Sequence, residues 1–194
     1  IDFIDGKNDG LVISPVFDEI SLDVFSKIKN MSNFILLDPQ GFLRRKNDQN
    51  EIFLEKTSLD LSRITAIKTN SDELKSLTGS DGDDGMKLLQ NQGIENVILT
   101  NKQKISLLVK DKIYSINLPN IRLHDTTGIG DIFCATFCCT MLKEKDFLWA
   151  LCFAGGAAQA ALESKQFGVE KIPPKGLIEN NGSYFYNMVQ FRTI

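Results

Sequence analysis

Residues 125–133 read Asp-Thr-Thr-Gly-Ile-Gly-Asp-Ile-Phe and stand at the start of a long helix-forming segment. Glycines at 128 and 130 let the backbone turn tightly and direct its N–H groups at an anion. A helix that begins here adds the positive end of its dipole at the same point. Asp131 would repel a bound phosphate, so its best use is to accept a proton from a hydroxyl that attacks the phosphate. The alternative is an ordinary loop in which this aspartate caps a helix.

A second polar motif, Asn70-Ser71-Asp72-Glu73, follows the short apolar run at residues 64–67. The same spacing is typical of a capping box, in which the side chains of Asn70 and Glu73 each bond to the other's backbone. It is also a pair of oxygen ligands at the end of a strand. On the residues alone, both interpretations stay open.

Taken together, the two motifs resemble the signatures of the ribokinase-like, or PfkB, carbohydrate kinase family, which read D-T-x-G-A-G-D-x-F and N-x-x-E. The resemblance extends from about Val12 to Pro173. It implies an α/β fold with a three-layer αβα doubly wound sheet. It also implies an ATP-dependent phosphotransferase that moves the γ-phosphate to a hydroxyl of a small sugar, polyol or nucleoside. The alternatives are a dedicated nucleoside kinase and a non-catalytic relative that binds nucleotide or sugar.

The resemblance assigns roles in phosphoryl transfer residue by residue. Asp131 matches the catalytic base, and the backbone N–H groups of Gly128, Ile129, Gly130 and Asp131 match the anion hole. Asn70 and Glu73 match the pair that organises Mg²⁺ and its waters. Asp125, with the Thr127 carbonyl, resembles the K⁺ site of some members.

Further positions are expected to contact the two substrates. For the nucleotide they are Thr100, Lys102, Thr126, Gly128 and Gly130, and for the acceptor they are Asp38, Gln40 and Arg44. For residues 39–41 a structural turn is an equal alternative. For the two lysines after Thr100 the alternative is a solvated hairpin end.

Three departures from the family pattern bear on these expectations. Residues 101–105 lack both glycines of the family's nucleotide loop, which predicts weak or unusual donor selectivity. Ile129 replaces a small residue, and its β-branched side chain resists unusual dihedral angles. The part that carries the lid and the sugar-contacting glycines in the family is absent from this sequence, so we expect a partial chain with negligible transfer by itself.

Composition fits one enzyme domain over residues 1–194, with 42% hydrophobic and 24% charged residues. A net charge of −3 argues against a nucleic-acid partner. The longest apolar run, residues 132–142, is too short to cross a bilayer. We expect a cytoplasmic protein, with a homodimer as one expected assembly, whose four cysteines are core thiols. His124 is interpreted as structural or loop-lining.

Apolar runs and periodic stripes alternate along the chain, which is typical of a doubly wound α/β fold. The carboxyl ends of the strands should therefore form the ligand site. The pattern predicts strands at 11–13, 34–37, 64–67 and 96–100, a hairpin at 104–118, and helices at 18–30, 71–77, 83–92, 128–143 and 146–163.

Overall fold

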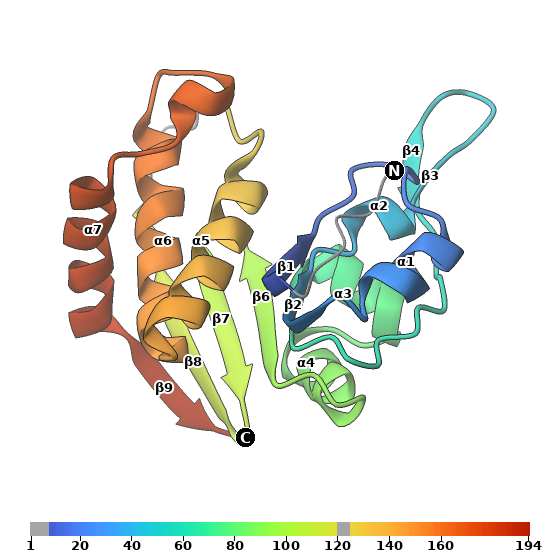
Figure 1. Cartoon of the computed structure of the whole chain (residues 1–194), viewed down its shortest axis with the longest axis horizontal. Helices are drawn as coiled ribbons and strands as arrows, with labels where there is room; N and C mark the ends of the chain where they lie inside the picture. Colours follow the sequence, from blue (N-terminus) through green and yellow to red (C-terminus); the bar gives the residue numbers. More distant parts are fainter. Residues whose placement is uncertain (1–7, 120–124) are drawn as a thin grey trace.

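The computed structural model describes residues 8–119 and 125–194, and its centre is a mixed sheet of seven strands. Four neighbouring strands run parallel, and three more continue the sheet in antiparallel order (Figure 1). In spatial order the strands are β1 (Asn8–Ile13), β2 (Ser32–Leu37), β5 (Ala66–Asn70), β6 (Asn96–Asn101), β7 (Lys104–Val109), β8 (Lys112–Asn117) and β9 (Gln190–Thr193).

Helices cover both faces of this sheet, which confirms the predicted three-layer αβα fold. Because each face is covered, a central strand such as β2 reads as a continuous apolar run, and residues 35–37 are fully buried. One face carries α1 (Leu22–Ile28), α2 (Gln40–Leu43), α3 (Ser71–Thr78) and α4 (Gly82–Asn91). The other carries α5 (Ile129–Glu144), α6 (Phe147–Glu163) and α7 (Lys175–Met188).

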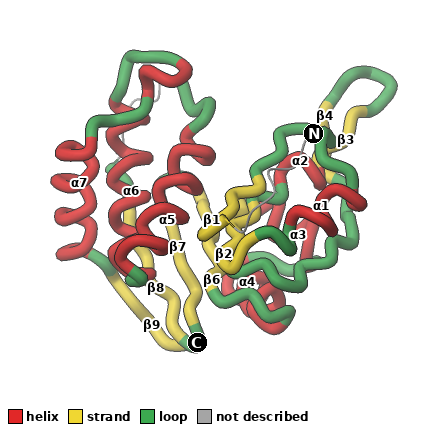
Figure 2. The backbone as a smooth tube through the Cα atoms, viewed as in Figure 1, coloured by secondary structure: helices red, strands yellow, loops and turns green. Residues whose placement is uncertain are grey.

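Several elements were not predicted from the sequence. Residues 39–41, for which a structural turn was one of two equal alternatives, begin the single-turn helix α2. A separate two-stranded sheet, β3 (Arg44–Lys46) and β4 (Ile52–Leu54), projects away from the main sheet (Figure 2). Helix α7 and strand β9 also went unpredicted, and the helix expected at 18–30 is shorter.

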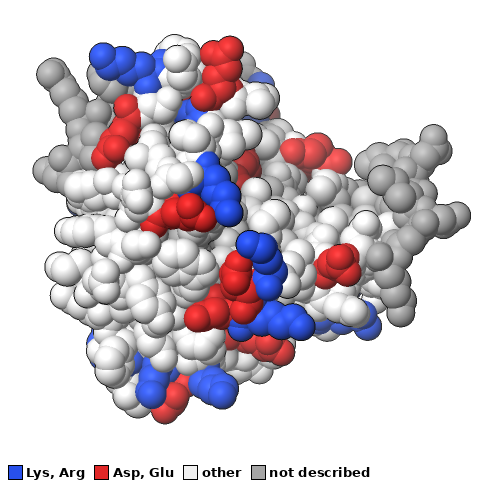
Figure 3. All heavy atoms as spheres, turned by 60° about the vertical axis from the view of Figure 1, so that its left-hand side comes forward, with Lys and Arg blue, Asp and Glu red and all other residues white. Residues whose placement is uncertain are grey.

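Helix α7 forms because it packs closely on α6. A Cβ atom at Gly156 would lie 2.7 Å from the backbone nitrogen of Gly182 and 2.8 Å from the carbonyl of Ile178. The small residues of α6 therefore permit this close helix approach. On the face turned forward in Figure 3, acidic and basic side chains are interspersed among wide uncharged areas.

The fold brings the ends of the parallel strands to one edge, where α5 also begins. Strands β1, β2, β5 and β6 run in the same direction, so Ser14, Asp38, Asn70 and Thr100 all lie at their carboxyl ends. Figure 1 shows β6 pointing toward the edge from which α5 descends. Such an edge is where open α/β sheets bind ligands.

Candidate active site

The start of α5 is a tight turn with free backbone donors, at the place where the sequence predicts an anion hole. Gly128 adopts the left-handed conformation, with φ 77° and ψ −2°, and a side chain would be strained there. The N–H groups of Gly128, Gly130 and Asp131 have no hydrogen-bond acceptor among the residues that the structure describes. Three free donors and the positive end of the helix dipole therefore face the same edge of the sheet.

Ile129 does not disturb this turn. The positive φ falls on Gly128, whereas Ile129 is already the first residue of the helix. Its N–H donates to the Thr126 carbonyl at 3.3 Å, and its side chain packs against the core below α5 and α6. The β-branched side chain is therefore tolerated, because it stands where the backbone is helical.

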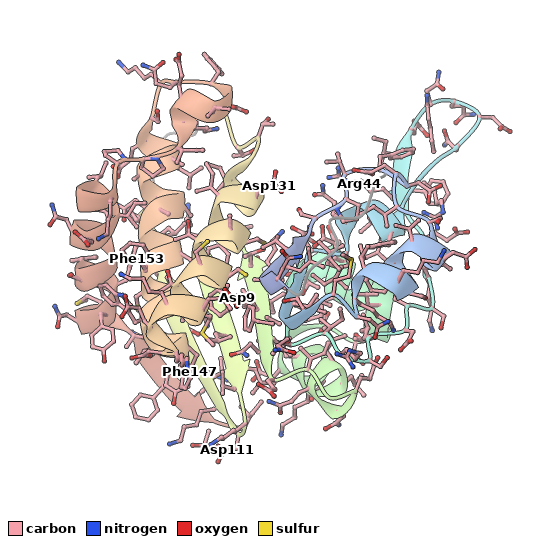
Figure 4. All side chains as sticks on the ribbon, viewed as in Figure 1. Asp9, Arg44, Asp111, Asp131, Phe147 and Phe153 are labelled. Atoms are coloured by element: carbon pink, nitrogen blue, oxygen red, sulfur yellow. The ribbon has the colours of Figure 1, made fainter. Side chains whose placement is uncertain are left out.

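Asp131 lies in the first turn of α5, exposed at the mouth of the site (Figure 4). Its Oδ1 atom accepts a hydrogen bond of 2.8 Å from the hydroxyl of Ser14, which directly follows β1. This bond orients the carboxylate and leaves its second oxygen available to another hydroxyl.

A buried ion pair lies directly beneath the turn at Gly130. Nζ of Lys68 is 2.8 Å from Oδ2 of Asp38, and the side chains are 10% and 5% exposed. A Cβ atom built on Gly130 would be 3.5 Å from Nζ of Lys68 and 3.7 Å from Oδ2 of Asp38. A methyl group at Gly130 would therefore be in ordinary contact with the pair and would lie between the turn and the Lys68 ammonium.

The sequence interpretation missed Lys68. The signal was a lysine inside an apolar strand, between Ile67 and Thr69, where a charge is rarely buried without a partner. Burial alone would lower the pKa of the Lys68 ammonium, but the carboxylates of Asp38 and Glu73 outweigh burial and raise the pKa. Lys68 is therefore a fixed positive charge under the turn.

Asn70 and Glu73 form a complete capping box at the start of α3. The Asn70 side chain accepts from the Glu73 N–H at 2.9 Å, and Oε2 of Glu73 accepts from the Asn70 N–H at 2.8 Å. Glu73 is 2% exposed, and this burial raises its pKa against the opposing effect of Lys68. The capping interpretation is confirmed. The Mg²⁺ role that the family resemblance implies for the same two residues stays a prediction.

These two residues fit Mg²⁺ only as partial ligands. Among the residues described, no group of three or more His, Cys, Asp or Glu could hold a metal ion. Within that part of the chain, Oε1 of Glu73 also has no hydrogen-bond partner. A carboxylate oxygen in the first turn of α3 suits Mg²⁺, which usually keeps several waters and takes its other ligands from substrate phosphates.

A cavity of about 430 Å³ opens between the β6–β7 hairpin and helices α5 and α6. Its polar lining includes four of the residues expected to bind nucleotide together with the unpredicted Lys68. Its apolar wall lies on β7, α5 and α6. The lining includes Lys68, Thr100, Lys102, Thr126 and Gly130 on the polar side, and Ile105, Ile129, Phe133, Ala158 and Leu162 on the apolar side.

The other predicted site residues lie around this cavity. Lys102 occupies the tight β6–β7 turn with φ 53°, where the family's glycine loop would be. Gly128 lines a neighbouring hollow with Asp125 and Asp131. Figure 4 shows Arg44 across the molecule from Asp131, at the same edge. Nη1 of Arg44 donates to the Val16 carbonyl at 3.4 Å, and Gln40 opens α2.

The other sequence expectations concern residues away from this cavity. His124 lies outside the described residues. Cys134, Cys138 and Cys152 are buried free thiols, and burial raises the pKa of Cys152 to about 12. Cys139 is exposed, so it is not the core thiol expected. Between residues 8 and 119 and from 125 onward, no helix has the length and apolar character that a membrane span needs.

Residues 7–172 match the model of the pfkB family carbohydrate kinases. The chain belongs to this family. Comparison with curated proteins by sequence gave no significant match.

Solved structures of the same fold include a pyrophosphate-dependent kinase in the ribokinase family, complexed with a pyrophosphate analog and myo-inositol. It superposes with a TM-score of 0.77 at 19% identity, over 92% of this chain and 64% of that one. Ribokinase from Thermotoga maritima gives a TM-score of 0.71 at 18% identity, over 89% and 56% of the two chains. Arabidopsis thaliana ribokinase, complexed with ribose and ATP, gives a TM-score of 0.60 at 21% identity, over 87% of this chain and 62% of that one. This pfkB-family chain therefore spans less than two thirds of the structures that it matches.

Proposed function

We propose that the protein transfers the γ-phosphate of ATP to a hydroxyl group of a small sugar, polyol or nucleoside. One observation carries the proposal. Three N–H groups at the start of α5, which have no acceptor among the described residues, lie between a buried cation, Lys68, and an exposed carboxylate, Asp131. The cation and the N–H groups suit a transferring phosphoryl group, and the carboxylate suits the hydroxyl that attacks it.

The donor is proposed to lie in the cavity beside the β6–β7 hairpin. Its apolar wall suits a purine ring, and Thr100, Lys102 and Thr126 suit the sugar and phosphates. Lys68 would attract the terminal phosphates from below Gly130, because its charge is held in place by Asp38. Asn70 and Glu73 would hold Mg²⁺ through waters, and the ion would neutralise charge on the donor phosphates.

Asp131 is proposed as the general base. Its Oδ1 atom is held by Ser14, so its other oxygen can accept the proton of the acceptor hydroxyl as that oxygen attacks phosphorus. The resulting P–O⁻ charge faces the N–H groups of Gly128, Gly130 and Asp131. Asp38 stays a proposed substrate residue along with Gln40 and Arg44, although the Asp38 carboxylate already binds Lys68.

Pyrophosphate is a second candidate donor, favoured by a specific observation. The segment after Thr100 carries Lys102 and Lys104 and lacks both glycines that would approach a nucleotide closely. A structurally similar kinase is described as pyrophosphate-dependent. The apolar wall of the cavity favours ATP, since pyrophosphate has no group to fill it.

The free cysteines fit a reducing compartment such as the cytoplasm.

The test is a transfer assay with the full-length protein. It would be incubated with Mg²⁺, either ATP or pyrophosphate, and panels of sugars, inositols and nucleosides, and phosphate esters would be detected by ³¹P NMR. We expect an ester with ATP and at least one acceptor. A folded protein that binds MgATP but forms no ester with any acceptor would favour the non-catalytic alternative and contradict the proposal.

A further inference from the structure

The side chain of Lys171 is buried in a pocket made of oxygen atoms. Lys171 ends the short 3₁₀ helix η1 (Gly168–Lys171) and is 3% exposed. Its Nζ atom donates to the Asp125 carbonyl at 2.8 Å, to Oδ2 of Asp125 at 3.0 Å and to the Thr127 carbonyl at 3.1 Å. An ammonium group has three N–H donors, and all three are used here.

This set of oxygens is the kind that a monovalent cation would take. Two are backbone carbonyls and one belongs to a carboxylate, and all come from the segment that leads into α5. Asp125 is also the residue that the sequence predicts as a K⁺ ligand. Because the Lys171 ammonium is already among these oxygens, the residues do not fit a separate K⁺ ion at this point.

The contacts of Lys171 also determine where an anion-hole donor points. In a trans peptide the C=O and the following N–H point in opposite directions. The Thr127 carbonyl is directed at Nζ of Lys171, so the N–H of Gly128 points away from it. That N–H is one of the three free donors at the start of α5.

A second contact fixes the same segment from the side of Asp125. Oδ1 of Asp125 accepts the Thr127 N–H at 2.9 Å, while its other carboxylate oxygen binds Lys171. The pKa of Asp125 is lowered to about 2 by hydrogen bonds, first from the backbone N–H and the side chain of Thr127 and then from Lys171. The carboxylate is therefore ionised at any physiological pH and holds both partners.

We propose that the ammonium of Lys171 is a covalently attached substitute for a monovalent cation, and that it positions the anion-hole turn. The inference rests on the proposed kinase function for its effect on rate, but not for its effect on cation binding. The protein should therefore work without K⁺. Shortening Lys171 should open a site that K⁺ or a small alkylammonium ion can fill.

The first experiment needs no variant. The turnover and the melting temperature of the full-length protein are measured in KCl and in tetramethylammonium chloride at equal ionic strength. We expect both to be the same in the two salts. A requirement for K⁺, seen as more than a few-fold loss of turnover in tetramethylammonium, would overturn the proposal.

The second experiment compares three variants. Lys171→Ala removes the cation and leaves space, Lys171→Met removes the cation but fills the space, and Lys175→Ala changes an exposed lysine of α7. Loss of one anion-hole donor costs on the order of 10²–10³ in kcat, so misplacing one should cost Lys171→Ala somewhat less, about 10–10². K⁺ or ethylammonium should restore at least part of this loss in Lys171→Ala, and none in Lys171→Met.

Cation binding is also followed by melting temperature, which does not depend on turnover. A rise of about 2–4 °C corresponds to about 1 kcal/mol in a protein of this size, and we expect such a rise with K⁺ or ethylammonium for Lys171→Ala alone. If no substrate is ever found, this shift still supports the proposal. A folded Lys171→Ala that shows neither the shift nor rescue, or that turns over like the wild type without added cation, would overturn it.

Discussion

The hydroxyl of Ser14 donates a hydrogen bond of 2.8 Å to Oδ1 of Asp131, a residue 117 positions further along the chain. The bond joins the carboxyl end of β1 to the first turn of α5. It therefore connects the parallel part of the sheet to the helix that carries the proposed general base. Because it fixes one carboxylate oxygen, it should decide which oxygen faces the acceptor.

Replacing Ser14 by alanine tests this relationship. A hydrogen bond to a charged group is worth about 1.5 kcal/mol or more, so Ser14→Ala should lower kcat by about 10-fold. The KM for the donor should change little, since Ser14 does not line the donor cavity. Steady-state kinetics check this, and unchanged kcat would show that Asp131 does not need Ser14 for its orientation.

Because Lys68 and Asp38 form a buried ion pair, removing one partner and removing both should affect the stability of the protein differently. Lys68→Met leaves two buried carboxylates, Asp38 and Glu73, without their cation, and should destabilise the protein by about 3–5 kcal/mol. Adding Asp38→Asn should restore much of this stability, because replacing a whole buried pair is often nearly neutral. Urea unfolding measures both effects.

Adding Asp38→Asn to Lys68→Met should restore stability, but it should not restore binding of the phosphate donor. The double variant lacks the cation beneath Gly130, so calorimetry should show weak MgATP binding although the protein is stable again. Wild-type affinity in the double variant would remove Lys68 from the proposed donor site.

Removing the charge of Glu73 should raise the stability of the protein but weaken its proposed function. Burial raises its pKa above the ordinary 4.5, so the folded state holds this proton more tightly than the unfolded state. Stability is therefore lost as pH rises from that value through the folded pKa. Glu73→Gln should retain the capping box, unfold at a higher temperature than the wild type at neutral pH, and lose this advantage as pH falls below the ordinary value.

The same variant should need more metal. If Glu73 helps to hold Mg²⁺ through waters, Glu73→Gln should raise the Mg²⁺ concentration needed for turnover by about 10–100-fold. A Mg²⁺ titration of turnover measures this. An unchanged Mg²⁺ requirement would leave Glu73 with the capping role alone.

Replacing Gly130 by alanine should affect the stability of the protein and its affinity for the phosphate donor differently. A methyl group there would lie in ordinary contact with Nζ of Lys68, so Gly130→Ala should fold and be as stable or up to about 1 kcal/mol more stable. It would also cover Lys68, so donor affinity should fall on the order of 10-fold, as expected for losing a hydrogen bond to a charged group. Gly176→Ala, with open space around it in α7, is the matched control and should leave affinity unchanged.

The sequence predicts those parts of the site that depend on local patterns. The turn at Gly128, the capping box at Asn70 and the strand ends were predictable because each is set by neighbouring residues. Lys68 and Lys171 were not, because their partners lie 30 and 44–46 residues away. The pairing becomes visible only once the strands are aligned and the segment after α6 returns to the start of α5.

Unpredicted elements of the fold have a similar explanation. Helix α7 contains Gly176, Asn180, Asn181 and Gly182, which have low helix propensity, and its stability comes from contact with α6. Strand β9 is exposed along its length and, among the described strands, pairs with β8 alone, so no buried stripe marks it in the sequence. In both cases tertiary packing overrides local preference.

The most direct test of the central claim is the pair of values kcat and ATP affinity for Asp131→Asn in the full-length protein. Asparagine keeps the shape and still suits a helix start, but it cannot accept the acceptor's proton. Asp146→Asn, at the start of α6, is the control for changing an aspartate of the same kind. If Asp131 is the general base, kcat should fall by about 10²–10⁴, with ATP affinity equal to the wild type or tighter. A kcat for Asp131→Asn as close to wild type as that of Asp146→Asn would contradict this role.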